Sequence, residues 1–454
     1  MADASPPSDG AREGSLDAPF RHALAWRDPD FTAMPLVEAE MERVFDICHG
    51  CRRCFNLCDS FPRLFDLIDN GSTGEVDGVA KADYAKVADA CTFCDMCFMT
   101  KCPYVPPHPF NVDFPHVMLR HRATKRKDGA EFVREQLGET DRNGKLASPV
   151  AGLANWATDL RNKPVRAVME AMVGIDKTAV LPRYHAKTAT DRLRVPTPPD
   201  PAGPAFGLRK AALYATCFVD YNAPDTATAA MAVLARQGVK TRLAYPECCG
   251  MPQLEAGDLA EVARRAERVS AELLPLVDQG FDIVTLTASC GLMMKFEWPL
   301  ILPENEDVRR LAAATRDISQ YVVELSKAHG LAPGLAAPTG GVTVHHACHA
   351  RAQNMGAVSA QMLRLIPGAK VDLVERCSGH GGTFGVMKET HAIAVKVGKA
   401  AARQVAQKAN ETLCSDCPLA CKHLGQLVGA DLAEGQAPPR QAHPIEVFAR
   451  AYGL

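Results

Sequence analysis

Two groups of closely spaced cysteines stand out near the start of this 454-residue chain. Each has the spacing C-x2-C-x2-C followed by a fourth cysteine, and the groups are Cys48, Cys51, Cys54, Cys58 and Cys91, Cys94, Cys97, Cys102. This spacing is typical of [4Fe–4S] ligation, in which one motif supplies three thiolates and the other motif supplies the fourth. We therefore expect crossed ligand sets. One cluster takes Cys48, Cys51, Cys54 and Cys102, and the other takes Cys91, Cys94, Cys97 and Cys58.

Zinc is the alternative metal for the same thiols. Four thiolates can hold one zinc ion, but such sites usually pair two C-x2-C units across a longer gap. The second group also ends in Cys102-Pro103, as ferredoxin motifs do, whereas Cys58 is followed by Asp59. The spacing therefore favours two [4Fe–4S] clusters, which makes electron transfer the expected chemistry.

Composition narrows the class of protein further. The chain is 47% hydrophobic, and its net charge of −2 gives no reason to expect nucleic acid as a partner. The N-terminus is polar and acidic, unlike a secretory signal, and no stretch of about eighteen apolar residues predicts a membrane span. Seventeen cysteines in such a chain indicate metal ligation in a reducing cytoplasm and not a set of disulfides.

A second cysteine system begins after residue 206, where predicted strands and helices alternate, as in a parallel sheet covered by helices. The predicted strands are 211–215, 240–244, 282–288, 342–346 and 370–375. Three pairs of cysteines match at offsets of 131, 129 and 127 residues: Cys217 with Cys348, Cys248 with Cys377, and Cys290 with Cys417. Nearly constant offsets predict an internal duplication.

These cysteines fall where predicted strands end, which is where parallel α/β sheets build ligand sites. The candidate metal ligands are Cys217, Cys248, Cys249 and Cys290 in the first repeat, and Cys348, Cys377, Cys414 and Cys417 in the second. Each repeat has four cysteines of a five-cysteine pattern. Thr287 replaces the missing cysteine in the first repeat, and Ser378 replaces it in the second. Four thiolates can hold an additional Fe–S cluster or a zinc ion. Alternatively, some of them are buried cysteines that act as small hydrophobic residues.

Histidines also flank the second repeat: His345, His346, His349 and His380. A neutral imidazole could ligate iron or carry a proton, and the alternative is a hydrogen-bonded structural role. The stretch 379–385 is rich in glycine but matches neither G-x-G-x-x-G nor a P-loop. We therefore expect a tight backbone turn there and not a phosphate site.

The expected fold is α plus α/β: a helical two-[4Fe–4S] ferredoxin domain followed by two duplicated α/β cysteine-rich domains. The expected boundaries are 1–35 for a disordered or extended N-terminus, 36–125 for the ferredoxin-like domain, 126–205 for a helical connector and linker, and 206–335 and 340–450 for the two repeats. Within the connector, 153–173 has apolar residues near helical spacing beside basic ones, and Pro164 should kink or split it. Such a segment is either an amphipathic core helix or a docking helix for a partner or a membrane surface.

Two [4Fe–4S] motifs followed by two Cys…Cys-Cys-Gly…Cys-x-x-Cys repeats resemble the iron–sulfur oxidoreductases that share the cysteine-rich CCG domain. This family includes the C subunit of anaerobic glycerol-3-phosphate dehydrogenase, the iron–sulfur subunit of glycolate oxidase, and heterodisulfide reductase subunits. The resemblance covers about residues 40–450 and is strongest to the glycerol-3-phosphate dehydrogenase type. It is carried by His349-Ala350-Arg351-Ala352-Gln353, by Glu375-Arg376-Cys377-Ser378-Gly379 and by Asn155-Trp156.

The resemblance implies an electron-transfer subunit of a respiratory-type oxidoreductase and not a stand-alone catalyst. It would relay electrons from a flavoprotein dehydrogenase, of the glycerol-3-phosphate or 2-hydroxy acid type, toward quinone. A partner is needed because the sequence has no flavin or nicotinamide fingerprint. The protein would be cytoplasmic, or peripheral on the inner face of the cell membrane.

Three other functions remain open. One is a heterodisulfide or thiol–disulfide reductase acting at the CCG site, which the missing cysteines at Thr287 and Ser378 make less favourable. Another is a redox partner of a rubrerythrin-like stress protein. The third is a non-catalytic Fe–S sensor or scaffold, although the sequence shows no DNA-reading element.

Overall fold

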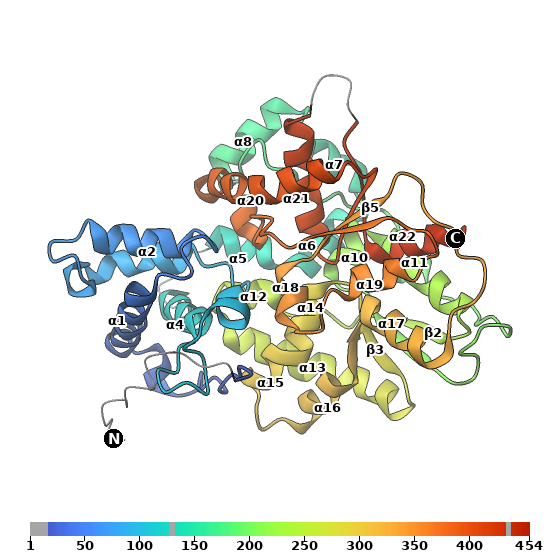
Figure 1. Ribbon diagram of the computed structural model, residues 1–454, viewed down its shortest axis with the longest axis horizontal. Coiled ribbons are helices and arrows are strands. Elements are labelled where there is room, and N and C mark those ends of the chain that lie inside the picture. The colour runs from blue at the N-terminus through green and yellow to red at the C-terminus, as the bar shows by residue number, and fades with distance from the viewer. Residues whose placement is uncertain (1–16, 127–131, 433–436) are drawn as a thin grey trace. The chain divides into compact units, whose positions relative to one another are not determined.

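The computed structural model describes residues 17–126, 132–432 and 437–454, and it divides into two compact units. The first unit comprises Met1–Ala130 and Leu254–Leu259, and the second comprises Glu131–Gln253 and Ala260–Leu454. Figure 1 labels helices of both units and the strands β2, β3 and β5 of the second.

Helices make up the described part of the first unit. They are α1 (Met34–Cys51), α2 (Ser60–Asp69), α3 (Tyr84–Asp89) and α4 (Phe114–Arg126), with the short turns η2 (Pro29–Thr32), η3 (Val76–Gly78), η4 (Lys81–Asp83) and η5 (Cys97–Lys101). The buried residues of α1 repeat at helical spacing, so that one face of the helix enters the core: Val37, Met41, Val44 and Phe45. Phe61 of α2 packs on Phe114 of α4, with ring centroids 4.5 Å apart.

The segment before α1 lies along the first unit. Its Phe20 donates a backbone hydrogen bond to the carbonyl of Pro106 (3.2 Å), and Arg21 forms ion pairs with Asp95 and Asp113. The expected disordered or extended N-terminus falls partly outside the described residues, because these begin at residue 17. From residue 17 to α1 the described chain forms no strand, includes the helical turn η2, and is held by these contacts.

Two four-stranded parallel sheets form the centre of the second unit. Their strand orders are β2-β1-β3-β4 and β6-β5-β7-β8, and every neighbouring pair is parallel. The strands are β1 (Lys210–Tyr214), β2 (Lys240–Ala244), β3 (Asp282–Thr285), β4 (Thr315–Asp317), β5 (Val342–His345), β6 (Val371–Val374), β7 (Thr412–Ser415) and β8 (Arg440–Ala442). The same order in both sheets confirms the prediction of two duplicated α/β repeats.

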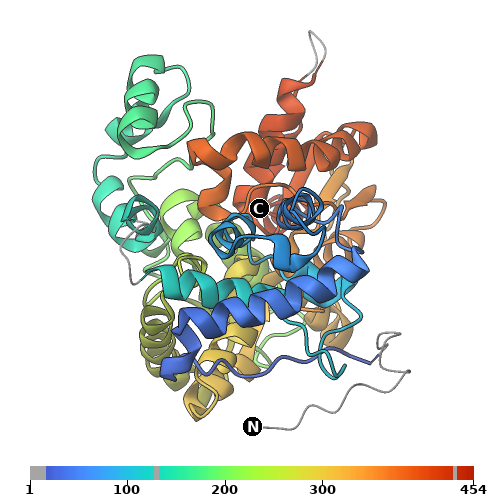
Figure 2. The same cartoon turned by 90° about the vertical axis from the view of Figure 1, so that its left-hand side faces the viewer.

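Helices connect these strands, as parallel pairing requires. The first repeat has α10 (Cys217–Asn222), α11 (Pro224–Arg236), α12 (Met251–Glu255), α13 (Leu259–Asp278), α14 (Ala288–Leu292), η6 (Met293–Glu297), α15 (Trp298–Ile301), α16 (Glu306–Ala314) and α17 (Ile318–His329). The second has α18 (Cys348–Ala352), α19 (Val358–Arg364), η7 (Gly382–Gly385), α20 (Lys388–Lys408), α21 (Pro418–Ala430) and α22 (Pro444–Ala451). Before the repeats come α5 (Phe132–Gly138), α6 (Thr140–Ala147), α7 (Ala151–Thr158), α8 (Lys163–Val173) and α9 (Ala189–Arg192), of which α7 and α8 form a hairpin visible in Figure 2.

The structure differs from the sequence prediction at the sheet edges. The sequence does not predict β4 and β8, because three residues are too few to show a strand pattern. The strand predicted over 282–288 ends at Thr285, since Thr287 is already the N-cap of α14. The expected interruption near Pro164 is present: α7 ends at Thr158, and Pro164 lies in the first turn of α8.

The register of the two sheets changes how the repeats align. Tyr214 of β1 pairs with Thr285, and His345 of β5 pairs with Ser415, so Thr285 and Ser415 occupy equivalent positions. Counting from there, Thr287 corresponds to Cys417; each is the N-cap of the helix that follows. The sequence offsets match Cys290 with Cys417. The strand register instead matches Cys417 with Thr287, which lies three residues before Cys290. Cys414 is thereby equivalent to Val284, a residue of the hydrophobic core.

Candidate metal centres

The eight cysteines of the first unit lie at the ends of its helices and in the segments between them. Their sulfur atoms fall into two sets by mutual electrostatic influence. The nearby thiols of Cys102, Cys54 and Cys51 raise the pKa of Cys48. Those of Cys94 and Cys91 raise the pKa of both Cys58 and Cys97. Cys48, Cys51, Cys54 and Cys102 also line one small cavity. Cys58, Cys91, Cys94 and Cys97 form the second set by their electrostatic influence on one another. Cys54 also raises the pKa of Cys97, so the two groups are neighbours.

Burial dominates the electrostatics of these thiols. It raises the pKa of Cys54 and of Cys91 to about 12, although Lys101 and Arg53 near the first and Arg122 near the second oppose the shift. Metals and clusters bind the thiolate form. Thiolates that are buried and close together are unfavourable unless positive charge, such as that of iron ions, lies between them. This donor set therefore fits an iron cluster.

The backbone between these cysteines is unusual. Arg52, Phe93 and Asp95 have left-handed φ angles of 49°, 47° and 60°. Such angles are uncommon for residues other than glycine and concentrate at functional sites. They turn the chain sharply between successive cysteines. A small cavity among the first group is closed by the apolar side chains of Phe61, Phe65 and Val112.

The N-terminal segment covers the second cysteine group. Arg21 donates two hydrogen bonds to the Asp95 carboxylate, at 2.7 and 3.0 Å, and its guanidinium lies 4.4 Å from the centre of the Phe98 ring. Asp95 lies between Cys94 and Cys97 in the sequence and is buried. The ion pair therefore fixes the loop that carries these two cysteines, a role that the sequence does not reveal.

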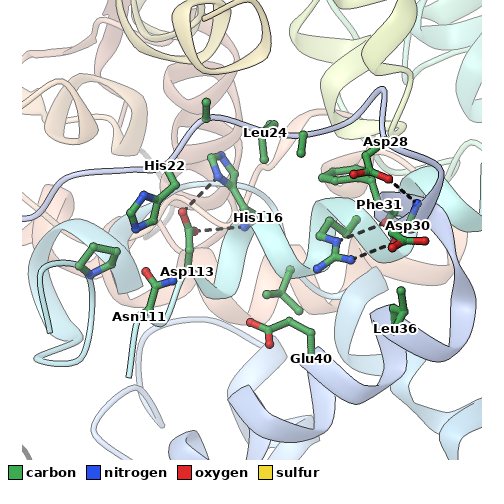
Figure 3. Close-up of a pocket in the computed structure, with 15 residues that line it drawn as sticks. His22, Leu24, Asp28, Asp30, Phe31, Leu36, Glu40, Asn111, Asp113 and His116 are labelled. Atoms are coloured by element: carbon green, nitrogen blue, oxygen red, sulfur yellow. Dashed lines mark hydrogen bonds and ion pairs between the residues drawn. The ribbon is translucent and has the colours of Figure 1, made fainter. Parts of the chain in front are cut away.

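A groove of about 340 Å³ lies between the N-terminal segment and α4 in the same unit (Figure 3). Its polar wall includes His22, Asn111 and Asp113, and its apolar wall includes Leu24 and Phe31. The pKa of Asp113 is lowered well below its usual range because His116 and Arg21 outweigh the cost of its burial. The groove borders the loop that follows Cys102, to which Asn111 belongs. Its volume falls within the range of small-molecule sites.

In the first repeat, four thiols form a chain of contacts at the carboxyl edge of the sheet. Cys217 follows β1, Cys248 and Cys249 follow β2, and Cys290 lies in α14 after β3. The sulfur atoms of Cys249 and Cys290 are 3.2 Å apart. Hydrogen bonds from Cys217 and Cys249 to the sulfur of Cys248 lower the pKa of Cys248. All four predicted ligands of this repeat are therefore together.

Aromatic side chains enclose these four thiols. Trp298 is completely buried and donates its indole N–H to the carbonyl of Cys249 at 3.0 Å. Tyr214 donates its hydroxyl to the carbonyl of Glu247, and its ring lies 5.6 Å from that of Tyr245. Burial raises the pKa of both tyrosines well above the usual value. The thiols thus lie in a largely water-free site, where a metal centre would be protected.

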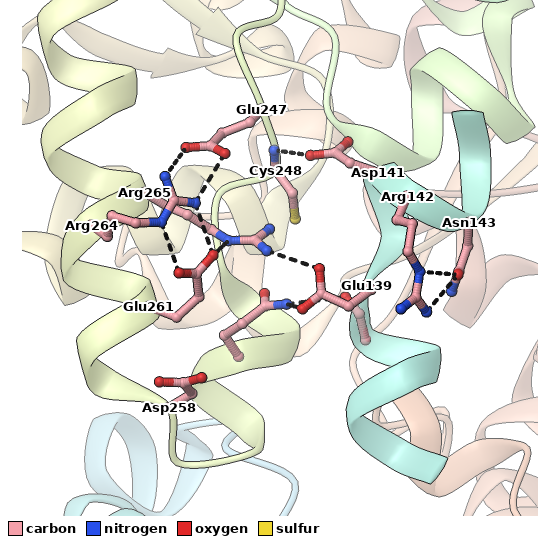
Figure 4. Close-up of polar contacts among 12 residues, drawn as sticks. Glu139, Asp141, Arg142, Asn143, Glu247, Cys248, Asp258, Glu261, Arg264 and Arg265 are labelled. Atoms are coloured by element: carbon pink, nitrogen blue, oxygen red, sulfur yellow. Dashed lines mark hydrogen bonds and ion pairs between the residues drawn. The ribbon is translucent and has the colours of Figure 1, made fainter. Parts of the chain in front are cut away.

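Helix α6 closes the first-repeat site from a distant part of the sequence (Figure 4). Thr140 lies beside the sulfurs of Cys217 and Cys248, where it adds to the lowering of the Cys248 pKa and partly opposes the rise in the pKa of Cys217 that Cys248 and burial cause. Asp141 accepts the backbone N–H of Cys248 at 2.7 Å and also the hydroxyl of Tyr245. The sequence assigns these residues to a connector, because no local motif links them to cysteines a hundred residues away.

Replacing Asp141 with asparagine should weaken the first-repeat site without unfolding the protein. Asparagine keeps one acceptor but turns an amide donor toward either the Cys248 N–H or the Tyr245 hydroxyl, so one buried group loses its partner. We expect about 1–3 kcal/mol of lost stability and roughly tenfold weaker metal retention, typical of residues that support ligands. Metal analysis during chelator challenge measures the second effect. Asp159→Asn, at an exposed ion pair, is the control and should leave retention unchanged.

The second repeat gathers fewer thiols than expected. Cys377 and Cys348 are hydrogen-bonded to each other, and Gly379 directs its N–H at the Cys377 sulfur at 3.3 Å. Cys417 follows the adjacent strand β7 and packs near Ala288, Ala347 and Ala350. The structure does not bring Cys414 to this group. Its side chain lies in the hydrophobic core, where burial and Cys421 raise its pKa.

The histidines of the second repeat have mainly structural contacts. His345 hydrogen-bonds Ser415 and the carbonyl of Arg376, both at 3.0 Å, and His346 pairs with Glu375 at 3.1 Å. His380 is buried with its ring 5.8 Å from that of His423. Burial lowers the pKa of His345 to about 4 and that of His380 to about 3, so both are neutral at physiological pH. The hydrogen-bonded role therefore describes His345 and His346 best.

A site for a single metal ion needs its ligands closer together than a cluster does. Thiolates around one zinc ion lie within about 4 Å of one another, because each Zn–S bond is ~2.3 Å long. Among the described residues, no three His, Cys, Asp or Glu side chains converge closely enough to hold one ion. Within the same residues, no helix is both long and apolar enough to cross a membrane.

Fold and site together define a protein with two α/β repeats, each presenting cysteines at the carboxyl edge of its sheet. The model of the CCG cysteine-rich domain matches residues 211–295 and 342–423, one copy for each repeat. The chain is 28% identical over 352 residues to the C subunit of the anaerobic glycerol-3-phosphate dehydrogenase of Escherichia coli K12, covering 76% of this chain and 83% of that protein. It is 32% identical over 190 residues to lactate utilization protein A of Geobacillus kaustophilus, covering 39% of this chain and 74% of that protein. The chain therefore belongs to the CCG cysteine-rich domain family, as its sequence motifs indicate.

Proposed function

We propose that this protein is an iron–sulfur electron-transfer subunit that relays electrons from a flavoprotein dehydrogenase toward quinone. The observation that carries the proposal is the sorting of eight thiols into two neighbouring groups of four. Similarity to a subunit of a dehydrogenase supports it. A [4Fe–4S] cluster bound by each group would accept and release single electrons.

The residues of the chain have distinct roles under this proposal. The ligands are Cys48, Cys51, Cys54 and Cys102 for one cluster and Cys58, Cys91, Cys94 and Cys97 for the other. Phe61, Phe65 and Val112 keep water from the first group, and the Arg21–Asp95 ion pair holds the loop of the second. Residues 36–125 would thus act as a ferredoxin-like domain. The groove beside Asn111, in the same unit, offers a place for a small acceptor such as quinone.

The two repeats would contribute differently. The first has four thiols in a closed aromatic site, which suits an additional Fe–S cluster. The second has Cys348, Cys377 and Cys417, one thiol fewer than expected, at an edge where Cys377 and Cys417 are partly accessible. It would serve as a docking platform for the dehydrogenase partner or as a partly open metal site.

Iron and sulfide analysis with EPR tests the proposal directly. Protein purified without oxygen should contain about eight irons, or about twelve if the first repeat also binds a cluster. After dithionite reduction, the EPR spectrum should show two interacting reduced clusters, since the two thiol groups are neighbours. Fewer than about four irons with stoichiometric zinc would contradict the proposal.

A second function, reduction of a disulfide at the second repeat, is favoured by the contact between Cys348 and Cys377. Here a substrate disulfide would take up two protons and two electrons, delivered one at a time from the flavoprotein partner through the clusters of the first unit, and leave as two thiols. Cys377→Ser should abolish this activity while leaving the iron of the first unit intact. Unchanged turnover in that variant would eliminate this function.

A further inference from the structure

The hairpin of α7 and α8 and the residues beside it expose several large apolar side chains to solvent. Met172 is 76% exposed and Leu153 is 64% exposed. The full set, here called the hairpin face, is Leu146, Val150, Leu153, Trp156, Leu160, Val168, Met172 and Val173. Within α7, Leu153 and Trp156 are three residues apart, and within α8, Val168 and Met172 are four apart, so each pair lies on one side of its helix. Leu146, Val150 and Leu160 lie just outside these two helices.

The hairpin is polar on the side that faces the rest of the unit, the reverse of an ordinary amphipathic helix. Arg166 of α8 is completely buried and donates to the carbonyls of Asp176 and Ala179, both at 2.7 Å. Asn155 of α7 exchanges two hydrogen bonds with the backbone of Tyr184, at 2.8 and 2.9 Å. The hairpin is thus attached by polar anchors while its apolar side chains point outward. The interpretation as a core helix does not hold.

The hairpin is also fixed to the second repeat, so its orientation is defined. Lys388 donates its N–H to Gly174 at 2.7 Å, and Asp176 donates its N–H to Val386 at 2.8 Å. Gln426 of α21 donates to the carbonyl of Thr178 at 2.8 Å. Figure 2 shows α7 and α8 projecting from the helices of the second repeat. A surface mounted in this way can bind a partner without first being ordered.

Charge around the hairpin face is positive, although the whole chain carries a net charge of −2. Four basic residues and one acidic residue, Asp159, occur between positions 142 and 165: the basic residues are Arg142, Lys145, Arg161 and Lys163. Asp159 forms an ion pair with Arg161 at 2.8 Å, and Glu170 of α8 forms one with Lys177. Within the described part of the chain, these acidic residues leave Lys145 and Lys163 as uncompensated positive charge beside the hairpin face.

We infer that the hairpin face docks this protein on an anionic lipid membrane, lying in the headgroup region without crossing it. Exposed leucine, methionine and tryptophan beside lysine and arginine are the composition of interfacial membrane helices. Neither helix can span a bilayer, since eleven residues extend only about 17 Å. The inference extends the proposed function because quinone is held in membranes, but the docking itself does not depend on the clusters.

Vesicle binding by the intact, cluster-loaded protein tests the inference. The probes are vesicles of phosphatidylcholine alone and of phosphatidylcholine with phosphatidylglycerol. We expect binding to the anionic vesicles that weakens with salt, together with a blue shift of Trp156 fluorescence. Leu153→Glu with Met172→Glu should reduce binding tenfold or more, because both apolar contacts are lost. Lys145→Gln with Lys163→Gln should reduce it severalfold on anionic vesicles only.

A matched control separates this site from general surface hydrophobicity. Leu208 is 64% exposed, as Leu153 is, and Val195 is 83% exposed, but both lie outside the hairpin. Leu208→Glu with Val195→Glu should leave vesicle binding unchanged. Equal losses in both double variants, no binding to anionic vesicles, or a hairpin variant that loses only a protein partner would each overturn the inference. Iron content and EPR of the hairpin variant should match the unaltered protein, so a failure of the electron-transfer proposal would be seen separately.

Discussion

Changing Cys102 to serine should remove about four of the eight irons expected in the first unit and leave the other cluster in place. The crossed arrangement makes this prediction specific. Cys102 belongs by sequence to the second motif, but the structure groups it with Cys48, Cys51 and Cys54. The EPR signal lost in Cys102→Ser should therefore be the one lost in Cys48→Ser. Electron transfer to quinone should fall at least tenfold in both variants, because a relay cannot pass an electron through a missing centre.

Cys58→Ser provides the reciprocal result. It should remove the signal that Cys97→Ser removes, because Cys58 lies with Cys91, Cys94 and Cys97. Cys421→Ser is the control for loss of a buried thiol, since the Cys421 sulfur hydrogen-bonds backbone carbonyls of the second repeat. It should change neither signal. If Cys102→Ser matched Cys91→Ser instead, each cluster would be bound by a single motif and the crossed arrangement would be wrong.

The second large effect concerns Cys417 and Cys414, two cysteines that the sequence treats alike. Cys417→Ser should remove any metal bound by the second repeat, because Cys417 follows the strand next to the one that leads to Cys348. Cys414→Val should leave the metal content unchanged. Its side chain lies in the core, and valine already occupies the equivalent position, Val284, in the first repeat. Metal analysis of the two variants, with unfolding monitored in parallel, distinguishes the two roles.

Equal loss of metal in both variants would show that Cys414 turns toward the site when metal is present, and would contradict the placement of its side chain in the core. Loss in neither variant would show that the second repeat is a docking platform without metal. The free energy of unfolding of Cys414→Val should change by less than about 1.5 kcal/mol, as expected for an apolar exchange of similar volume in a core.

Much of this protein follows from the sequence. The cysteine spacing predicts two thiol groups that share ligands between the motifs, because a short loop can present only three thiols to one point. The alternation of β-rich and helical segments predicts the two α/β repeats, since parallel strands need crossover helices. The repeat motifs also indicate the family, which the similarity to known proteins confirms.

Other features were decided only by tertiary structure. The extent of β7 decides the roles of Cys414 and Cys417, because Cys414 lies within the strand with its side chain in the core, whereas Cys417 lies beyond the strand as the N-cap of α21. Asp141 reaches Cys248 across 107 positions of the sequence, a contact that no local pattern records. The outward direction of the hairpin face is likewise hidden, because the same helical spacing suits a buried face or an exposed one. Buried Arg166 and hydrogen-bonded Asn155, not the apolar residues, anchor that hairpin.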